Sequence, residues 1–209
     1  MTDGQKKTLA ILLPRYTIPQ DAGVFSFEKI FHRISPIFLE IGFGTGTALI
    51  EMAQEKPDCD FIGVEVFASG AQKALSAIHN QSLSNVRILL ADAVEILDRY
   101  MPPKSLDGVF IFFPDPWPKT RHHKRRLINP VFLDLLQAKM KTGAIIYLAT
   151  DWKPYAEWMM EALSKASGFE NMAGIGQYAP RPTFRPLTKF EKRGNRLGHN
   201  TWDLKFKVR

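Results

Sequence analysis

The chain has 209 residues and a mass of 23.8 kDa, and 45% of its residues are hydrophobic and 23% are charged. This composition excludes collagen-like, disordered and miniature proteins and predicts a single domain that spans residues 1–209. Cys59 is the only cysteine and no basic-then-apolar leader opens the chain, so we expect a cytoplasmic protein without disulfides. The longest apolar runs are far shorter than the roughly 18 residues that cross a bilayer, which predicts no membrane association.

The formal net charge of +7 is concentrated in two segments. Residues 181–209 hold nine Lys and Arg against two acids, which accounts for the whole excess. Residues 119–126 carry five further Lys and Arg and no acid. A neutral body with concentrated basic segments is typical of a protein that binds a polyanion. A solvated basic surface explains the composition alone equally well.

Short apolar runs alternate with longer mixed segments along the chain. Residues 1–20 are polar and weakly patterned, so they are predicted to form a mobile arm. Strands are expected at 37–41, 61–66, 86–90, 109–113 and 144–149. Helices are expected at 47–54, 69–79, 94–99, 130–140 and 153–167. Residues 201–208 alternate apolar and polar side chains, as a half-buried antiparallel strand does. The pattern predicts an α/β fold with a doubly wound, mostly parallel, Rossmann-like sheet and an antiparallel C-terminal strand.

A glycine-rich turn follows the first predicted strand. Gly42, Gly44 and Gly46 lack a Cβ, so the backbone there can turn sharply and approach a ligand. A nicotinamide fingerprint would need its third glycine at Thr47, which disfavours an oxidoreductase. Together with the acid before the turn, Glu40, these glycines resemble the loop that wraps the methionine part of S-adenosylmethionine, whose ammonium and sulfonium favour nearby carboxylates. A tight turn without any ligand is the alternative.

Two more acids stand at the ends of the next two strands. Glu65 comes 19 residues after Gly46, where a carboxylate accepts the hydroxyls of a ribose. Asp92 follows the third strand, where it could accept from an adenine amino group. Each acid alone is better explained as a helix cap or a surface residue. Their position at the ends of successive strands nevertheless favours cofactor binding.

The fourth strand leads into a proline-rich loop, Phe113-Pro114-Asp115-Pro116-Trp117-Pro118-Lys119. The prolines flanking Asp115 restrict its backbone and remove competing N–H donors. A parallel sheet that ends in an antiparallel strand resembles the plan of class I S-adenosylmethionine-dependent methyltransferases, in which this position faces the methyl group. A rigid turn capped by Asp115 is the alternative, but three prolines around one acid and a tryptophan favour the functional interpretation.

A basic segment without acids follows this loop directly. An ordinary solvated helix surface would interleave acids with the bases. The adjacent histidines suggest a metal site, but no third ligand stands at a supporting spacing, so no metal is expected. Contacts with RNA are therefore predicted for Arg121, His122, His123, Lys124, Arg125 and Arg126.

These segments together resemble the tRNA (guanine-N7-)-methyltransferase family of class I S-adenosylmethionine-dependent enzymes. The resemblance extends from about Phe38 to the C-terminus. Its motifs are Glu40-Ile41-Gly42-Phe43-Gly44-x-Gly46, Phe113-Pro114-Asp115-Pro116-Trp117-Pro118-Lys119, Arg121-His122-x-Lys124-Arg125-Arg126, Ala149-Thr150-Asp151-Trp152, Arg185-Pro186-x-Thr188-Lys189-Phe190-Glu191, Arg193-Gly194-x-x-x-Gly198 and Trp202-Asp203-Leu204.

The resemblance implies a Rossmann-like methyltransferase that methylates N7 of a guanosine in tRNA, conventionally position 46 of the variable loop. It implies a cofactor site of Glu40, Gly42, Gly44, Gly46, Glu65, Asp92 and Asp115, with Asp115 also catalytic. It implies substrate binding by Lys119, Asp151, Thr188, Lys189, Phe190 and Glu191. A monomer or homodimer with tRNA as its partner, and no obligatory protein partner, is expected.

The chemistry of guanine N7 limits what the protein must supply. This atom has an in-plane lone pair and no proton, so it needs alignment and electrostatic support rather than a general base. Asp115 or Asp151 could accept from guanine N1 and the exocyclic amino group, and Trp117 or Trp152 could stack on the base. A small-molecule methyltransferase would not need the basic C-terminal segment, and a non-catalytic RNA-binding module would tolerate loss of the cofactor acids.

Overall fold

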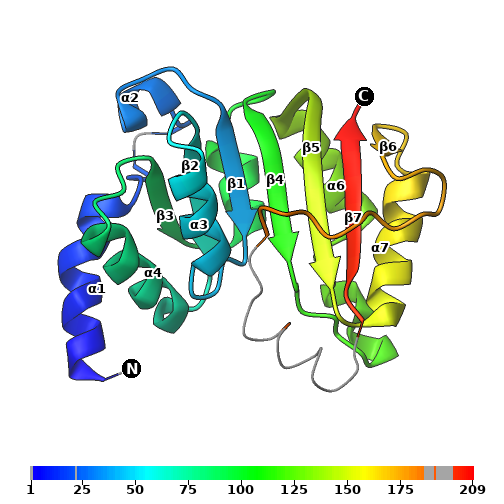
Figure 1. The fold of residues 1–209 in the computed structure, drawn as a ribbon, viewed down its shortest axis with the longest axis horizontal. Coiled ribbons are helices and arrows are strands. Elements are labelled where there is room, and N and C mark those ends of the chain that lie inside the picture. The colour runs from blue at the N-terminus through cyan, green and yellow to red at the C-terminus, as the bar shows by residue number, and fades with distance from the viewer. Residues whose placement is uncertain (1, 22, 186–190, 192–199) are drawn as a thin grey trace.

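The computed structural model describes residues 2–21, 23–185, 191 and 200–209. In this part of the chain, seven strands form one sheet in the order β3-β2-β1-β4-β5-β7-β6 (Figure 1). The strands are β1 (Ile37–Ile41), β2 (Asp60–Glu65), β3 (Val86–Leu90), β4 (Leu106–Phe112), β5 (Met140–Thr150), β6 (Phe169–Asn171) and β7 (Trp202–Val208). The first five are parallel, whereas β7 runs antiparallel to β5 and β6. The predicted fold class is therefore confirmed.

Helices cover both faces of this sheet. They are α1 (Asp3–Tyr16), α2 (Phe27–Phe31), α3 (Thr47–Glu55), α4 (Ala68–Asn80), α5 (Ala93–Glu95), the π-helical turn η1 (Ile96–Tyr100), the 3₁₀ helix η2 (Thr120–Arg125), α6 (Pro130–Lys139) and α7 (Lys153–Lys165). Residues of α1, α3 and α4 share one buried cluster, and residues of η1, α6 and α7 share the other. Across the described ranges, no helix is long and apolar enough to cross a membrane.

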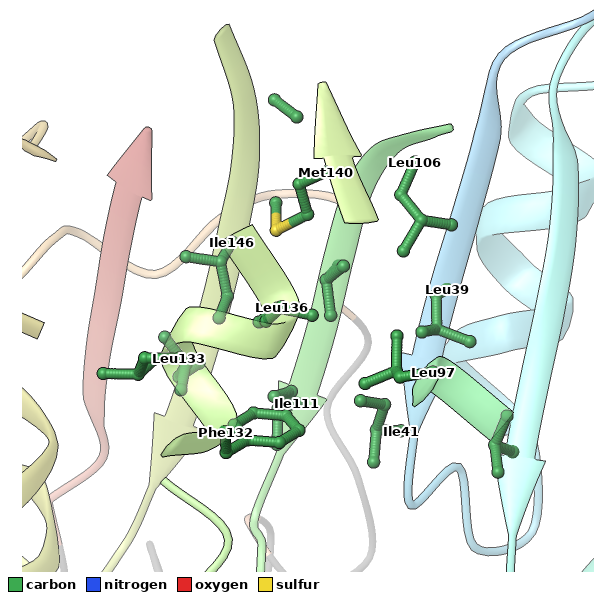
Figure 2. Close-up of a cluster of buried hydrophobic side chains, with 14 of the residues drawn as sticks. Leu39, Ile41, Leu97, Leu106, Ile111, Phe132, Leu133, Leu136, Met140 and Ile146 are labelled. Atoms are coloured by element: carbon green, nitrogen blue, oxygen red, sulfur yellow. The ribbon is translucent and has the colours of Figure 1, made fainter. Parts of the chain in front are cut away.

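Side chains alternate between the two faces along each strand, as the pleat requires. On β1, Leu39 and Ile41 enter the cluster that contains α6 and η1 (Figure 2), whereas Phe38 packs against the opposite cluster. The central parallel strands are thus apolar on both sides, which explains their near-continuous hydrophobic runs. This double burial holds the carboxyl ends of β1 and β4 side by side at one edge of the sheet.

The C-terminal strand lies inside the sheet, where it pairs with β5 from Ile145 with Lys207 to Thr150 with Trp202. The outer position belongs to β6, which pairs with the other side of β7. The sequence does not predict β6, because three residues are too few to show an alternating pattern.

The N-terminal segment differs from the mobile arm that its sequence pattern predicts. Residues Asp3–Tyr16 form α1, and Leu12 and Tyr16 are 8% and 6% exposed in the cluster shared with α4. The Tyr16 hydroxyl lies 3.2 Å from Nδ1 of His79 on α4. The physical reason is a short apolar stripe at helical spacing, which is sufficient to dock the helix even among charged neighbours.

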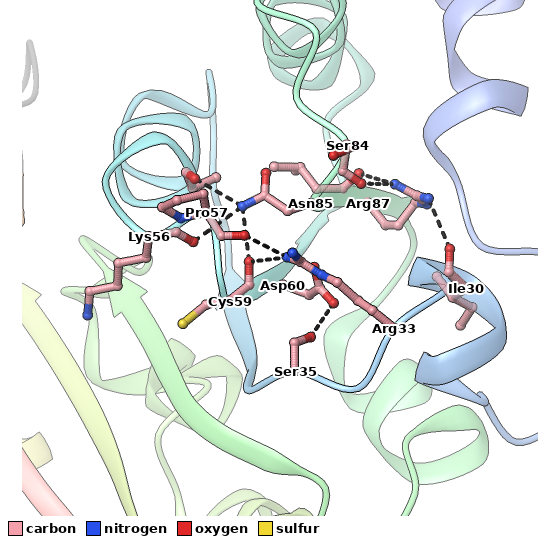
Figure 3. Close-up of polar contacts among 12 residues, drawn as sticks. Ile30, Arg33, Ser35, Lys56, Pro57, Cys59, Asp60, Ser84, Asn85 and Arg87 are labelled. Atoms are coloured by element: carbon pink, nitrogen blue, oxygen red, sulfur yellow. Dashed lines mark hydrogen bonds and ion pairs between the residues drawn. The ribbon is translucent and has the colours of Figure 1, made fainter.

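Buried polar groups tie together the amino ends of the strands. The Asp60 carboxylate, at the start of β2, accepts hydrogen bonds from Arg33 Nε at 3.0 Å and from the Ser35 hydroxyl (Figure 3). Beside it, Asn85 Nδ2 donates to the Cys59 carbonyl at 3.0 Å. These satisfied groups stabilise the edge of the sheet opposite to the glycine-rich turn.

Candidate active site

A cavity of about 340 Å³ opens at the carboxyl ends of β1, β2, β3 and β4. Open α/β sheets bind their ligands at this edge. Four residues with predicted cofactor roles line the cavity: Gly42, Glu65, Asp92 and Asp115. They follow four different strands, so the parallel topology brings them together.

The glycine-rich turn connects β1 to α3 with a left-handed backbone. Gly42, Gly44 and Gly46 have φ values of 74°, 56° and 78°, a region that favours glycine. At Gly46 a Cβ would also lie 2.6 Å from the Cβ of Ala74, so the third glycine is needed for close packing against α4. At Gly42 and Gly44, by contrast, a Cβ would meet no atom within 4 Å, so the first two glycines face open space.

Glu65 holds this turn in place from the end of β2. Its Oε2 accepts from the Gly44 amide at 2.8 Å, and its Oε1 accepts from the amides of Val66 at 2.8 Å and Phe67 at 3.0 Å. A carboxylate offers about four lone-pair positions, so the three amides leave about one for a ligand hydroxyl. Glu65 is buried and lines the cavity, so this acceptor position lies at the cavity wall.

Glu40, which the sequence assigns to the cofactor site, is a buried carboxyl that is not itself among the residues lining the cavity. It lies on β1 just before the glycine-rich turn and is 3% exposed, and its Oε2 has no hydrogen-bond partner among the described residues. Burial, together with the nearby charge of Glu65, raises the pKa of Glu40 to about 8. A buried carboxyl without a partner gains most from a cationic ligand, so these residues fit a group that carries an ammonium and a sulfonium.

Asp92 caps a helix, which is one of the roles that the sequence suggests, and it also lines the cavity. Its Oδ1 caps α5 by accepting from the amides of Val94 at 2.7 Å and Glu95 at 3.3 Å. The exposed side chain also lines the cavity. Capping fixes the orientation of this carboxylate, with Oδ1 engaged by the helix.

The proline-rich loop after β4 is braced in an unusual conformation. Phe113 and Trp117 have φ values of 53° and 44°, which are costly for residues with a side chain. The Phe113 amide donates to the Ala149 carbonyl at 2.7 Å, and Arg126 Nε donates to the Pro116 carbonyl at 2.9 Å. The loop thus presents the exposed Asp115 to the cavity from a fixed backbone.

The basic segment divides into exposed and buried side chains. Arg121, Lys124 and Arg125 are exposed on η2 and its end. The Arg125 guanidinium lies 4.9 Å from the ring centroid of Trp117, and both residues line the cavity. His122 and His123 are half-buried. Arg126, which the sequence predicts to contact RNA, is 3% exposed, and its Nε donates to the Pro116 carbonyl.

The residues predicted to bind the substrate lie in different environments. Lys119 and Asp151 are exposed and stand outside the cavity lining. Thr188, Lys189 and Phe190 fall outside the described residues. Glu191 is 2% exposed and pairs with Arg185 at 2.7 Å, so its side chain is part of a buried charge cluster.

Two residues of the cavity were missed by sequence reasoning. Val66 and Phe67 are 60% and 66% exposed, and both line the cavity next to Glu65. The sequence could have indicated them, because large apolar residues that directly follow the end of a strand lie beyond the core. Exposed apolar groups at a cavity suit the flat face of an aromatic ligand.

The sheet order, the glycine-rich turn and the acids at successive strand ends define a Rossmann-like methyltransferase. The fold is similar to that of the 16S rRNA methyltransferase KamB, with a TM-score of 0.64 and 19% identity, covering 87% of this chain and 92% of that chain. Residues 34–204 match the sequence family described as "Putative methyltransferase".

Proteins of similar sequence identify the family within the methyltransferases. The chain is 50% identical over 206 residues to the tRNA (guanine-N(7)-)-methyltransferase of Pseudomonas savastanoi pv. phaseolicola, covering 99% of this chain and 84% of the relative. It is 48% identical over 206 residues to the enzyme of the same name from Stutzerimonas stutzeri, covering 99% and 87%. The chain belongs to the tRNA (guanine-N7-)-methyltransferase family.

Proposed function

We propose that this protein transfers the methyl group of S-adenosylmethionine to N7 of a guanosine in tRNA, and that the target is position 46 of the variable loop. The observation that carries the proposal is the 50% identity, over nearly the whole chain, to a relative named for guanine-N7 methylation of tRNA. Transfer RNA is then the partner of the basic surface, and the cytoplasm is the expected place of action.

The cavity residues suit the separate parts of the cofactor. When bound, S-adenosylmethionine supplies an electrophilic methyl group on a sulfonium. Glu65 offers its remaining lone pair to the ribose hydroxyls, and Asp92 offers Oδ2 to the adenine amino group. Glu40 keeps its proton at neutral pH in the ligand-free protein, and it would ionise when the cationic methionine end binds near the glycine-rich turn. The cavity lining and the unpartnered Glu40 oxygen support these roles.

Asp115 acts on the acceptor base in this proposal. Guanine N7 needs no deprotonation, so the carboxylate serves to orient the base by accepting from N1 and the exocyclic amino group. It also stabilises the positive charge that develops on the ring as N7 is methylated. The braced loop gives Asp115 a fixed starting position, and holding two reactants in line is worth about 7–11 kcal/mol in favourable cases.

The tRNA backbone is held outside the cavity. Arg121 and Lys124 are exposed on η2, one turn beyond the loop that carries Asp115. Their charges suit phosphate contacts that position the variable loop without reading bases. Lys119, at the end of the proline-rich loop, and Asp151, directly after β5, are both exposed and suit contacts with the substrate outside the cavity.

Label transfer to tRNA tests this function. Purified protein is incubated with methyl-labelled S-adenosylmethionine and unmodified tRNA transcripts, and the product is digested to nucleosides. The proposal expects labelled 7-methylguanosine, which disappears when guanosine 46 of the transcript is replaced by adenosine. Label at another guanosine would reject position 46 only, whereas transfer that does not require RNA would point to a small-molecule methyltransferase.

A further inference from the structure

Arg126 differs from the rest of the basic segment in where its side chain goes. It is 3% exposed, while its neighbours Lys124 and Arg125 are exposed to solvent. Its Nε donates to the Pro116 carbonyl at 2.9 Å, directly after Asp115 in the loop. The residue therefore joins the end of the basic segment to the loop that carries the reacting carboxylate.

Two aromatic rings of α7 enclose the guanidinium of Arg126. The ring centroid of Tyr155 lies 5.1 Å from its central carbon, and that of Trp158 lies 4.9 Å away. Trp158 is itself fixed, because its Nε1 donates to the Ile128 carbonyl at 2.7 Å. Aromatic faces attract a desolvated cation, so the cage holds Arg126 in one orientation. No ion pair to Arg126 occurs within the described part of the chain.

The loop needs such an external anchor. Residues 114, 116 and 118 are prolines and have no N–H, so the loop has few donors with which to fix itself. Trp117 has a left-handed φ of 44°, a conformation that persists only where the surroundings hold it. Apart from the Phe113 amide at the start of the loop, Arg126 supplies a donor at its centre.

We propose that Arg126 is a positioning residue that holds the Pro116 carbonyl and thereby orients Asp115 toward the reacting base, and that it is not a phosphate ligand. This inference rests on the proposed methylation of tRNA. Under this proposal α7 helps to position Asp115, because its Tyr155 and Trp158 side chains hold the Arg126 guanidinium in place.

The substitution Arg126→Lys separates the two roles. Lysine keeps the positive charge and binds phosphate well as a point charge, but it lacks the planar donor fork and the flat face that stacks in the cage. A positioning role predicts that the single-turnover methylation rate, at saturating tRNA and cofactor, falls about 10-fold to 100-fold, the scale of a small misplacement. The slope of log affinity for tRNA against log salt should stay at the parental value. A parental rate in the lysine variant would overturn the proposal.

Arg126→Met provides the complementary measurement. A residue that contacts phosphate would, when its charge is lost, flatten the salt slope by about 0.7 to 0.9. We expect no such change for Arg126→Met, and flattening of that size would overturn the proposal. Lys124→Met is the positive control for the slope, since its side chain is exposed. Arg99→Lys, at an exposed site on η1, controls for the substitution itself.

Hydrogen exchange tests the positioning role without any reaction. The amides of His122 and Arg126, which donate to the carbonyls of Lys119 at 2.8 Å and His123 at 3.0 Å, report on the segment after the loop. Faster exchange there in the Arg126→Lys variant, with a parental circular dichroism spectrum and urea midpoint as the check on folding, is the expected result. Parental exchange would contradict it.

If this variant does not fold, the same exchange measurement is made on Trp158→Phe, because this substitution weakens the cage around Arg126 and removes the hydrogen bond to the Ile128 carbonyl. If the parent protein does not methylate tRNA, the proposed function is wrong. The exchange result still tests whether Arg126 holds the proline-rich loop.

Discussion

The guanidinium of Arg185 and the carboxylate of Asp203 form a bidentate pair inside the protein. Nε and Nη2 of the arginine lie 3.1 and 3.0 Å from the two carboxylate oxygens, and the two side chains are 0% and 5% exposed. Arg185 also lies over the ring of Phe113, with 5.5 Å between its central carbon and the ring centroid. The pair therefore links strand β7 to the first residue of the proline-rich loop.

Breaking this pair should destabilise the fold strongly. Asp203→Asn leaves Glu191 as the remaining buried carboxylate partner of Arg185. Removing one partner of a buried pair costs about 3–5 kcal/mol when the other charge is left uncompensated, so we expect a loss near the lower end of that range. Urea unfolding followed by circular dichroism gives the difference in free energy. Lys207→Met, which removes an exposed pair on the same strand, is the matched control and should change stability by less than about 1 kcal/mol. A loss for Asp203→Asn as small as that of the control would contradict this view.

Glu40 should make the stability of the ligand-free protein depend on pH. Its folded-state pKa of about 8 lies above the ordinary value of 4.5, so the folded state keeps a proton that the unfolded state releases. Stability is therefore highest below the unfolded pKa and falls as pH rises toward 8, by about 1.4 kcal/mol per unit. Glu40→Gln should remove this decline. Unfolding free energies measured in urea across that range check it, and an unchanged decline in the glutamine variant would exclude Glu40 as the cause.

Glu65→Ala should weaken S-adenosylmethionine binding. The substitution removes the ribose acceptor and also the bond to the Gly44 amide at 2.8 Å. One hydrogen bond to a charged group is worth roughly 1.5–3 kcal/mol, so the dissociation constant should rise at least about 10-fold. Isothermal titration calorimetry measures it, with Glu95→Ala on the exposed face of α5 as the control. Unchanged cofactor affinity in the Glu65→Ala variant would remove Glu65 from the site.

The exposed part of the basic segment should bind phosphates without reading sequence. Arg121→Ala together with Lys124→Ala removes two exposed charges, so the slope of log affinity against log salt should flatten by about 1.4 to 1.8. Filter binding of tRNA over a series of salt concentrations provides the slope. The parental slope in the double variant would show that these side chains form only a solvated surface.

Most of the sheet, and the positions of the acids that line the cavity, can be predicted from the sequence. Apolar runs predict the five parallel strands, because strands buried on both faces must be continuously hydrophobic. The positions of Glu65 and Asp92 at strand ends are also readable, since the carboxyl ends of parallel strands meet at one edge. The docking of α1 and the three-residue β6 were not predicted, because each depends on tertiary packing rather than on a strong local pattern.

The sequence does not predict which charged side chains are buried and which are exposed. Arg126 and Arg125 are adjacent and chemically identical, yet one is buried in an aromatic cage and the other lies over Trp117 at the cavity. Only the packing of α7 against the end of the basic segment decides between them. Glu191 likewise lies in a motif that resembles a substrate site, but its carboxylate is buried against Arg185.

The most direct test of the account is the single-turnover rate of methyl transfer by the Asp115→Asn variant, measured at saturating tRNA and cofactor. If this carboxylate orients guanine and offsets the developing charge, the rate should fall about 100-fold or more, the scale of removing one preorganised electrostatic group. Affinity for tRNA should change little, because it comes mainly from phosphate contacts. The parental rate should be flat between neutral and mildly alkaline pH, since N7 has no proton to lose. A near-parental rate in the asparagine variant, or an ionisation near neutrality that vanishes in it, would contradict the account.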